Sequence, residues 1–295
     1  MRVVFLGASA ASYAPGLTAL LEERHEIACV ADPPATAAER AVLAAAEVLV
    51  TIRFGADLLP LPALRLLQVA AAGLDGVALE RVPAGVAIAN CFGHEAPIAE
   101  YVFAASLRRA IPLEVADREL RQGRWTHAAG TRATMHGELA GRTIGLLGFG
   151  HIGRAVAERA RAFGMRVHVC NRSSVVAAGV DSAWLLPGLH AFLGTLDVLV
   201  VSLPLADGTR GLIDGAALAA LPAGAFLINV GRGAVVEEAA LYDALRSGRL
   251  GGAAIDTWYR YPAPAEERTL PASLPFQELP NLLMTPHFSG WSEGT

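Results

Sequence analysis

The stretch Thr143-Ile-Gly-Leu-Leu-Gly-Phe-Gly-His-Ile-Gly153 decides the fold of this chain. It begins as an apolar run suited to a buried strand and continues as the pattern G-x-G-x-x-G, with glycines at Gly148, Gly150 and Gly153. Apolar side chains then recur at the spacing of one helix face, at Ile152, Val156, Ala160 and Phe163. A bare motif of this kind is often only a glycine-rich loop. Between a strand and a helix, however, the glycines permit a tight turn, approach of a pyrophosphate and close packing, so we predict a dinucleotide site.

The composition limits the classes of protein to which the chain can belong. Its 295 residues have room for two domains, and 53% apolar with 18% charged residues is typical of globular proteins. A net charge of −4 without a basic patch argues against a nucleic-acid partner. No apolar run reaches the roughly 18 to 20 residues of a membrane span, so we expect no membrane partner. Cys29, Cys91 and Cys170 lack metal-ligand spacing, which indicates reduced cysteines, no metal site and a cytoplasmic protein.

Short apolar runs that read as strands alternate with helical segments along the chain. We expect these strands at residues 3–8, 27–30, 48–52, 66–69, 86–89, 143–147, 167–170, 197–202, 225–230, 253–256 and 282–285. Helical patterns cover residues 15–24 and 237–247, and a long amphipathic segment runs over residues 97–121. This alternation predicts an α/β fold with two successive, doubly wound parallel sheets. The glycine after the first strand opens no fingerprint, so the first unit is a Rossmann-like shape without a phosphate site.

The residues after the second strand of the dinucleotide unit indicate which nicotinamide cofactor is bound. An acidic residue there selects NAD, but this chain has Asn171, Arg172 and Ser173. An arginine beside small amide and hydroxyl groups suits a 2′-phosphate, and we therefore favour NADP(H) over NAD(H). The alternative is a surface arginine with NAD(H) still bound.

Three polar residues end three consecutive strands of the dinucleotide unit. Arg232, in a tight glycine loop, can present a bidentate guanidinium to an α-keto acid. Asp256 can hold the nicotinamide carboxamide, and His287 can protonate a developing alkoxide near neutral pH. Each residue has a plausible structural role as a cap or a solvated side chain, but the set indicates catalysis.

Two loops of the first unit follow strands and could therefore reach a ligand. Residues 70–76 include Ala72, Gly73 and Leu74, whose backbone N–H groups could hold a carboxylate, although an ordinary loop is an equal alternative. Asn90 begins the second loop, in which His94 alone is more typical of a surface or capping histidine.

These stretches resemble the D-isomer-specific 2-hydroxyacid dehydrogenases. The matching segments keep the order and spacing of that family, and they are residues 86–90, 99–100, 148–153, 202–205 with Thr209, 229–233, 253–256 and 285–290. The resemblance implies two Rossmann-like domains with the cofactor domain inserted into the substrate domain. The implied substrate domain is flavodoxin-like and comprises residues 1–97 and 286–295, and the NAD(P)-binding domain comprises residues 98–285. It also implies a homodimer formed through the cofactor domain.

The resemblance also assigns roles to individual residues. Arg232 would bind substrate and His287 would be the acid/base. Further substrate-binding residues would be Ala72, Gly73, Leu74, Asn90 and Tyr261. The cofactor would be lined by Gly148, Gly150, His151, Ile152, Gly153, Asn171, Arg172, Ser173, Leu203, Pro204, Thr209, Val230, Gly231, Asp256 and Gly290.

The chain departs from the family pattern at Tyr261. Most relatives have a glutamate in that position, which hydrogen-bonds the histidine and raises its pKa. A neutral tyrosine cannot stabilise an imidazolium as a carboxylate does, so we predict that His287 titrates at lower pH than in those relatives. Glu266 or Glu267 is an alternative source of the carboxylate.

The most consistent interpretation is an NADPH-dependent reductase that converts a small 2-keto acid into a D-2-hydroxy acid. The run Asp-x-Trp-Tyr-x-x-Pro-Ala-Pro is similar to the formate dehydrogenase branch, so a formate- or phosphite-type dehydrogenase is the alternative. A non-catalytic NAD(P)H-sensing protein is a third possibility, against which the presence of both Arg232 and His287 argues. Relatives continue with a further helix, which leaves open whether the natural chain extends beyond Thr295.

Overall fold

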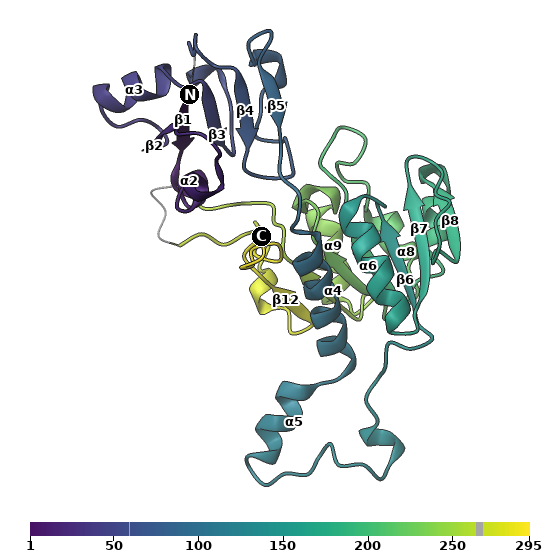
Figure 1. The fold of residues 1–295 in the computed structure, drawn as a ribbon. Helices are drawn as coiled ribbons and strands as arrows, with labels where there is room; N and C mark the ends of the chain where they lie inside the picture. The colour runs from purple at the N-terminus through teal and green to yellow at the C-terminus, as the bar shows by residue number, and fades with distance from the viewer. Residues whose placement is uncertain (59, 264–267) are drawn as a thin grey trace. The chain divides into compact units, whose positions relative to one another are not determined.

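The computed structural model describes residues 1–58, 60–263 and 268–295, which form two compact units, Met1–Phe92 and Gly93–Thr295. Each unit contains a parallel sheet with helices packed against it (Figure 1). The predicted α/β class with two parallel-sheet domains is therefore confirmed. The finer assignment of residues 1–97 and 286–295 to one domain and 98–285 to the other stays a prediction.

The first unit, in its described residues, is built on a five-stranded sheet in the order β2-β1-β3-β4-β5. Its strands are β1 (Arg2–Leu6), β2 (Glu26–Val30), β3 (Val48–Thr51), β4 (Leu66–Val69) and β5 (Ala87–Ala89). Its helices are α1 (Ala8–Ala11), α2 (Leu17–Leu20) and α3 (Ala37–Ala44). Alternate β1 side chains face opposite sides, because Val4 and Leu6 join one buried cluster while Val3 and Phe5 join another. The sheet order is that of flavodoxin-like folds.

The helix expected over residues 15–24 is shorter than the sequence pattern suggests. Gly16 adopts a left-handed conformation with φ 90°, and Leu21 is already extended, so α2 has a single turn. The apolar spacing therefore overstated the length of this helix.

The second unit is built on a seven-stranded parallel sheet, counted over the described residues, in the order β12-β11-β10-β9-β6-β7-β8. Its strands are β6 (Thr143–Leu147), β7 (Arg166–Asn171), β8 (Ser182–Leu185), β9 (Val198–Val201), β10 (Phe226–Asn229), β11 (Gly252–Ile255) and β12 (Leu282–Met284). Numbered from β6, the first six strands have the 3-2-1-4-5-6 order of dinucleotide-binding folds, and the seventh extends the sheet beyond the sixth. The carboxyl ends of these strands consequently share one edge of the sheet.

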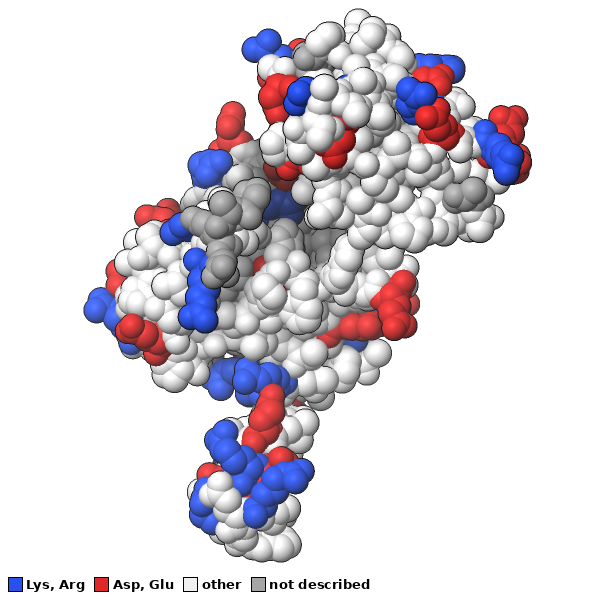
Figure 2. Space-filling model, turned by 90° about the vertical axis from the view of Figure 1, so that its left-hand side faces the viewer, with Lys and Arg blue, Asp and Glu red and all other residues white. Residues whose placement is uncertain are grey.

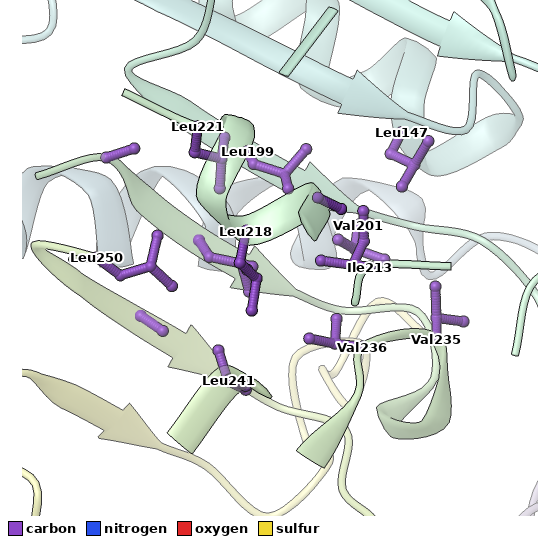
Figure 3. Close-up of a cluster of buried hydrophobic side chains, with 14 of the residues drawn as sticks. Leu147, Leu199, Val201, Ile213, Leu218, Leu221, Val235, Val236, Leu241 and Leu250 are labelled. Atoms are coloured by element: carbon purple, nitrogen blue, oxygen red, sulfur yellow. The ribbon is translucent and has the colours of Figure 1, made fainter. Parts of the chain in front are cut away.

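Helices cover both faces of this sheet. One face packs against α4 (Glu95–Ala110) and α6 (His151–Ala162). The other face packs against α7 (Leu189–Leu193), α8 (Gly215–Ala220) and α9 (Glu238–Arg246). Figure 3 shows this second layer, in which Leu218 and Leu241 from the helices belong to the same buried cluster as Leu199 and Val201 of β9. The two apolar layers fix the positions of the strand ends that carry the polar residues.

The amphipathic segment over residues 97–121 forms two helices, α4 and α5 (Leu113–Leu120), rather than one. Pro112 lacks a backbone N–H and disfavours helical geometry at the preceding residue, and Ile111 is extended with φ −122° and ψ 106°. Figure 1 shows α5 and the loop after it standing away from the seven-stranded sheet. Among the described residues, no helix has the length and apolar character needed to cross a bilayer.

Candidate active site

The glycine turn joins β6 to α6 as the sequence predicts. Gly148 has φ 99° and donates its N–H to the Cys170 carbonyl at 2.9 Å. A Cβ on Gly153 would lie 2.4 Å from the Gly148 carbonyl oxygen, so only glycine permits this close packing of helix and turn. A Cβ on Gly150, by contrast, would meet no atom within 4 Å. Packing therefore does not demand glycine at Gly150, and its absent side chain leaves the backbone open to the approach of a ligand.

The amino terminus of α6 faces the space beside Gly150. Gly150, the N-cap residue, has no side chain to cap this end of the helix, and the backbone N–H groups of Ile152 and Gly153 meet no acceptor within the described residues. Backbone donors and the helix dipole suit a phosphate group. His151, Ile152 and Gly153 form the first turn of this helix. These features fit the pyrophosphate of a nicotinamide dinucleotide.

The residues expected around the adenosine end lie at the ends of β7 and β9. The Asn171 side-chain amide donates to the Ser173 hydroxyl at 3.1 Å and to the Ser173 carbonyl at 3.2 Å. Arg172 is exposed, and within the described part of the chain it has no hydrogen-bond or ion-pair partner. Thr209 donates to the Pro204 carbonyl at 2.7 Å and thereby closes the loop after β9.

Two glycines bring the loop after β10 against its neighbours. A Cβ on Gly231 would lie 2.6 Å from the Leu203 carbonyl oxygen, and one on Gly233 would lie 2.3 Å from that of Trp258. Between them, Arg232 is half-buried, and its Nη1 donates to the Gly231 carbonyl at 2.8 Å. The tight loop therefore holds the arginine backbone firmly at the carboxyl edge of the sheet.

Asp256 is fully buried at the end of β11 and organises the loop after β12. Its Oδ1 accepts hydrogen bonds from the Thr285 hydroxyl at 2.7 Å and from the Phe288 N–H at 3.0 Å, and its Oδ2 accepts one from the Ser289 N–H at 3.0 Å. The Tyr101 hydroxyl from α4 lies 2.8 Å from that of Thr285. Burial raises the pKa of Tyr101 to about 12, so this hydroxyl stays protonated. The carboxylate thus fixes the segment on which His287 is carried.

His287 is held in an unusual backbone conformation and paired with Tyr261. Its φ of 57° lies in the left-handed region, which non-glycine residues seldom adopt away from functional sites. Its Nδ1 lies 2.9 Å from the Tyr261 hydroxyl. The His287 side chain keeps access to solvent, but desolvation by the surrounding protein lowers its pKa. The Asp256 charge opposes this shift, and the Arg232 charge adds to it. Glu266 and Glu267 lie outside the described residues.

The structure also points to a residue that sequence reasoning undervalued. His94 is the N-cap residue of α4, but its side chain makes no capping hydrogen bond, so it does not cap the helix through its imidazole. The side chain is half-buried, and burial lowers the pKa of His94. The charge of Glu95 opposes this shift, and those of Arg232 and His151 add to it. A Cβ on Gly290 would lie 3.3 Å from that of His94, which gives Gly290 a packing reason to be glycine. Because His94 and Gly290 lie far apart in the chain, the sequence gave no signal of this proximity.

The remaining candidates belong to the first unit, after β4 and β5. The Asn90 amide donates to the Ala72 carbonyl at 2.8 Å and ties the two loops together. Across the described residues, the backbone N–H groups of Ala72, Gly73 and Leu74 meet no acceptor. They are therefore available as donors to a ligand. No group of histidine, cysteine, aspartate and glutamate side chains in the described ranges could hold a metal ion.

Comparisons with known proteins identify the family to which the chain is similar. The family model described as "D-isomer specific 2-hydroxyacid dehydrogenase, NAD binding domain" matches residues 103–289. Glyoxylate reductase of Aeropyrum pernix is 35% identical over 249 residues, which are 81% of this chain and 71% of that protein.

Two solved structures share the fold over nearly the whole chain. A D-isomer specific 2-hydroxyacid dehydrogenase family protein from Aeromonas salmonicida has a TM-score of 0.80 at 28% identity and covers 98% of this chain and 89% of its own. An NADPH-dependent glyoxylate/hydroxypyruvate reductase from Sinorhizobium meliloti, solved with NADP and malonate, has a TM-score of 0.76 at 27% identity, with coverages of 99% and 88%. The chain therefore belongs to the D-isomer specific 2-hydroxyacid dehydrogenase family, and it is an oxidoreductase similar to the glyoxylate reductases.

Proposed function

We propose that this chain is an NADPH-dependent reductase of small 2-keto acids and forms D-2-hydroxy acids. The observation that carries the proposal is the position of Arg232 and His287 at the carboxyl edge of the sheet that also carries the glycine turn. The bound dihydronicotinamide would supply the hydride. The Arg232 guanidinium would bind the keto-acid carboxylate and polarise its carbonyl, and His287 would donate the proton to the carbonyl oxygen.

The remaining site residues are assigned supporting roles. Asp256 would orient the nicotinamide carboxamide while it holds the loop of His287. The free N–H groups of Ala72, Gly73 and Leu74 would hold the substrate carboxylate, with Asn90 supporting their loop. We assign residues 1–97 and 286–295 to the substrate domain and residues 98–285 to the cofactor domain as part of the same proposal.

The preference for NADP(H) rests on the residues after β7. Arg172 is exposed and without a partner in the described chain, beside the hydroxyl of Ser173 and the amide of Asn171. A planar guanidinium with neighbouring donors suits a 2′-phosphate better than a neutral ribose. The solved Sinorhizobium meliloti reductase is named as NADPH-dependent, which supports this choice.

A formate- or phosphite-type dehydrogenase is the second candidate, because Tyr261 gives His287 a neutral partner. Oxidation of formate needs no proton from a histidine, and the neutral pair is compatible with that chemistry. The chain would then release hydride from an oxyanion rather than reduce a carbonyl.

A substrate panel tests the proposal directly. NADPH and NADH oxidation is followed with glyoxylate, hydroxypyruvate, pyruvate and phenylpyruvate, and NAD and NADP reduction is followed with formate and phosphite. We expect NADPH-dependent turnover of at least one keto acid. Turnover of formate or phosphite alone would establish the second candidate, and tight cofactor binding without any turnover would indicate a sensing protein.

We further propose a cytoplasmic homodimer formed through the cofactor domain. All three cysteines are free, which supports a reducing compartment. On the segment that stands away from the sheet, Leu113, Trp125 and Met135 are 66%, 73% and 73% exposed. Figure 2 shows positive and negative side chains mixed with uncharged ones on this lower part of the molecule. The exposed apolar side chains among these charges suit burial against a second copy of the chain. Light scattering of wild type and of Trp125→Glu tests whether this segment forms the dimer contact.

A further inference from the structure

Several buried hydrogen bonds join the segment after β11, which carries Tyr261, to the segment after β12, which carries His287. Besides the three bonds accepted by Asp256, the Trp258 indole Nε1–H donates to the Thr285 carbonyl at 2.7 Å. Trp258 is only 6% exposed, and its ring packs edge-on against Phe276. The relative position of the two segments is therefore set by buried groups, independently of Tyr261.

The Tyr261 hydroxyl is held from both sides. Its oxygen accepts the Trp258 backbone N–H at 3.2 Å and lies 2.9 Å from Nδ1 of His287. Within the described residues, Nδ1 is the acceptor that the hydroxyl proton can reach, and Nε2 of His287 has no protein partner. Burial raises the pKa of Tyr261, so the hydroxyl keeps its proton at neutral pH.

We propose that Tyr261 is a positioning residue that holds Nδ1 of His287 in both protonation states and leaves Nε2 as the nitrogen that faces the substrate. This inference rests on the proposed function and deepens it. With neutral imidazole, the hydroxyl donates to Nδ1, and the ring proton sits on Nε2. With imidazolium, Nδ1–H donates to a free lone pair of the hydroxyl oxygen, and the hydroxyl proton turns toward solvent.

The proton count of the reductive step is consistent with this role. The imidazolium transfers the Nε2 proton to the carbonyl oxygen while the carbonyl carbon receives hydride. The carbonyl group of the substrate is thereby reduced to an alcohol. The ring left by this transfer is neutral and carries its proton on Nδ1, which still has the hydroxyl oxygen as its acceptor. Nε2 then takes up a proton from solvent, and the neutral form with the proton on Nε2 is that of the resting site. A glutamate in this position could only accept, and it would add a negative charge. Tyrosine therefore preserves the orientation of the ring without stabilising its charged form.

The other groups around His287 define what the substitution can change. Asp256 favours the imidazolium, Arg232 opposes it, and the raised pKa values of Tyr101 and Tyr261 keep both phenols neutral. Replacing Tyr261 by phenylalanine removes a neutral partner and should leave the pKa of His287 nearly unchanged. Replacing it by glutamate adds a charge, and we expect that pKa to rise by about one unit or more.

The experiment compares wild type with Tyr261→Phe, Tyr261→Gln and Tyr261→Glu, and uses Tyr242→Phe as the matched control. The Tyr242 ring packs edge-on against Phe276 in the second unit and makes no contact with His287. In the pH–rate profile of keto-acid reduction, we expect Tyr261→Phe to lower kcat about 10-fold without a shift of the profile. Tyr261→Gln, whose amide can donate or accept, should recover part of the loss. Tyr261→Glu should move the profile to higher pH.

A second readout does not depend on turnover. The ring nitrogens of ¹⁵N-labelled His287, assigned with His287→Asn, report which nitrogen carries the proton. In neutral wild type we expect the proton on Nε2, and in Tyr261→Phe a mixture of both tautomers. Unchanged nitrogen shifts in Tyr261→Phe, or an unchanged kcat, would overturn the inference. If no keto acid is turned over but the shifts change as expected, the proposed function fails and the positioning contact stands.

Discussion

Replacing Asp256 by asparagine should loosen the loop that carries His287. The buried carboxylate accepts three hydrogen bonds, from the Thr285 hydroxyl and from the backbone N–H groups of Phe288 and Ser289. An asparagine side chain has one acceptor oxygen. The orientation that loses least keeps that oxygen toward Thr285 and Phe288, and it turns the NH₂ group toward the Ser289 N–H. One buried donor is then left facing another donor.

The size of the effect follows from these contacts. An unsatisfied buried donor costs about 1–3 kcal/mol, and exchanging two bonds to a charged acceptor for neutral ones costs about 1 kcal/mol more. We therefore expect the local opening free energy of the loop to fall by about 2–4 kcal/mol. Since each 1.4 kcal/mol is a factor of ten, amide exchange at Phe288 and Ser289 should accelerate about 30- to 1,000-fold.

Hydrogen exchange resolved to these two amides is the appropriate assay, because a chain with two compact units need not unfold in one step. Asp243→Asn is the matched control. Asp243 and Arg246 form an ion pair in which each side chain is 66% exposed, and such pairs contribute less than about 1 kcal/mol. If exchange at Phe288 and Ser289 changed less than threefold in a folded Asp256→Asn protein, the carboxylate would not be what holds the loop.

Three further predictions concern the cofactor site and pH. Gly150→Ala should leave the melting temperature unchanged, because its Cβ enters open space, but it should weaken NADPH binding measured by calorimetry. Gly153→Ala should lower the free energy of unfolding by about 1–3 kcal/mol, because its Cβ meets the Gly148 carbonyl. Equal stability losses in the two variants would contradict this prediction. Arg172→Ala should weaken NADPH binding about 10- to 100-fold and leave NADH binding nearly unchanged, and an equal loss for both would remove Arg172 from the 2′-phosphate site. The pKa values of His94, His168 and His287 are lowered chiefly by burial, so the unfolded chain binds more protons than the folded chain between the folded pKa values and about 6.5. The second unit should therefore lose stability as pH falls from about 6.5 through these pKa values, and the loss should be smaller in His168→Gln. A melting temperature that rises on acidification would contradict the lowered pKa values of these histidines.

Local signals explain what could be predicted from the sequence. The residues of the glycine turn between β6 and α6 are contiguous in the sequence, so the motif could be recognised directly. Arg232, Asp256 and His287 each follow an apolar run that forms a strand in the structure. Because parallel strands share their carboxyl edge, the sequence order alone indicated that these ends would be neighbours.

The features that were not predicted depend on contacts between distant or weakly marked segments. The Tyr261 hydroxyl contact with His287 joins residues 26 apart, and the sequence marked Tyr261 only as a missing glutamate. The edge strand β8 was missed: its side chains alternate between half-buried and exposed, whereas those of β9, β10 and β11 are all buried. The break at Pro112 was marked by the proline, but the amphipathic spacing on both sides concealed it.

The turnover of His287→Asn tests the central claim most directly. His287 pays about 1–3 kcal/mol for its left-handed backbone, and asparagine tolerates that conformation, so the variant should fold at least as well as wild type. With the best keto acid of the panel, we expect kcat/KM to fall about 10²- to 10⁴-fold while NADPH binding is unchanged. A folded His287→Asn protein that reduces the keto acid as fast as wild type would contradict the account.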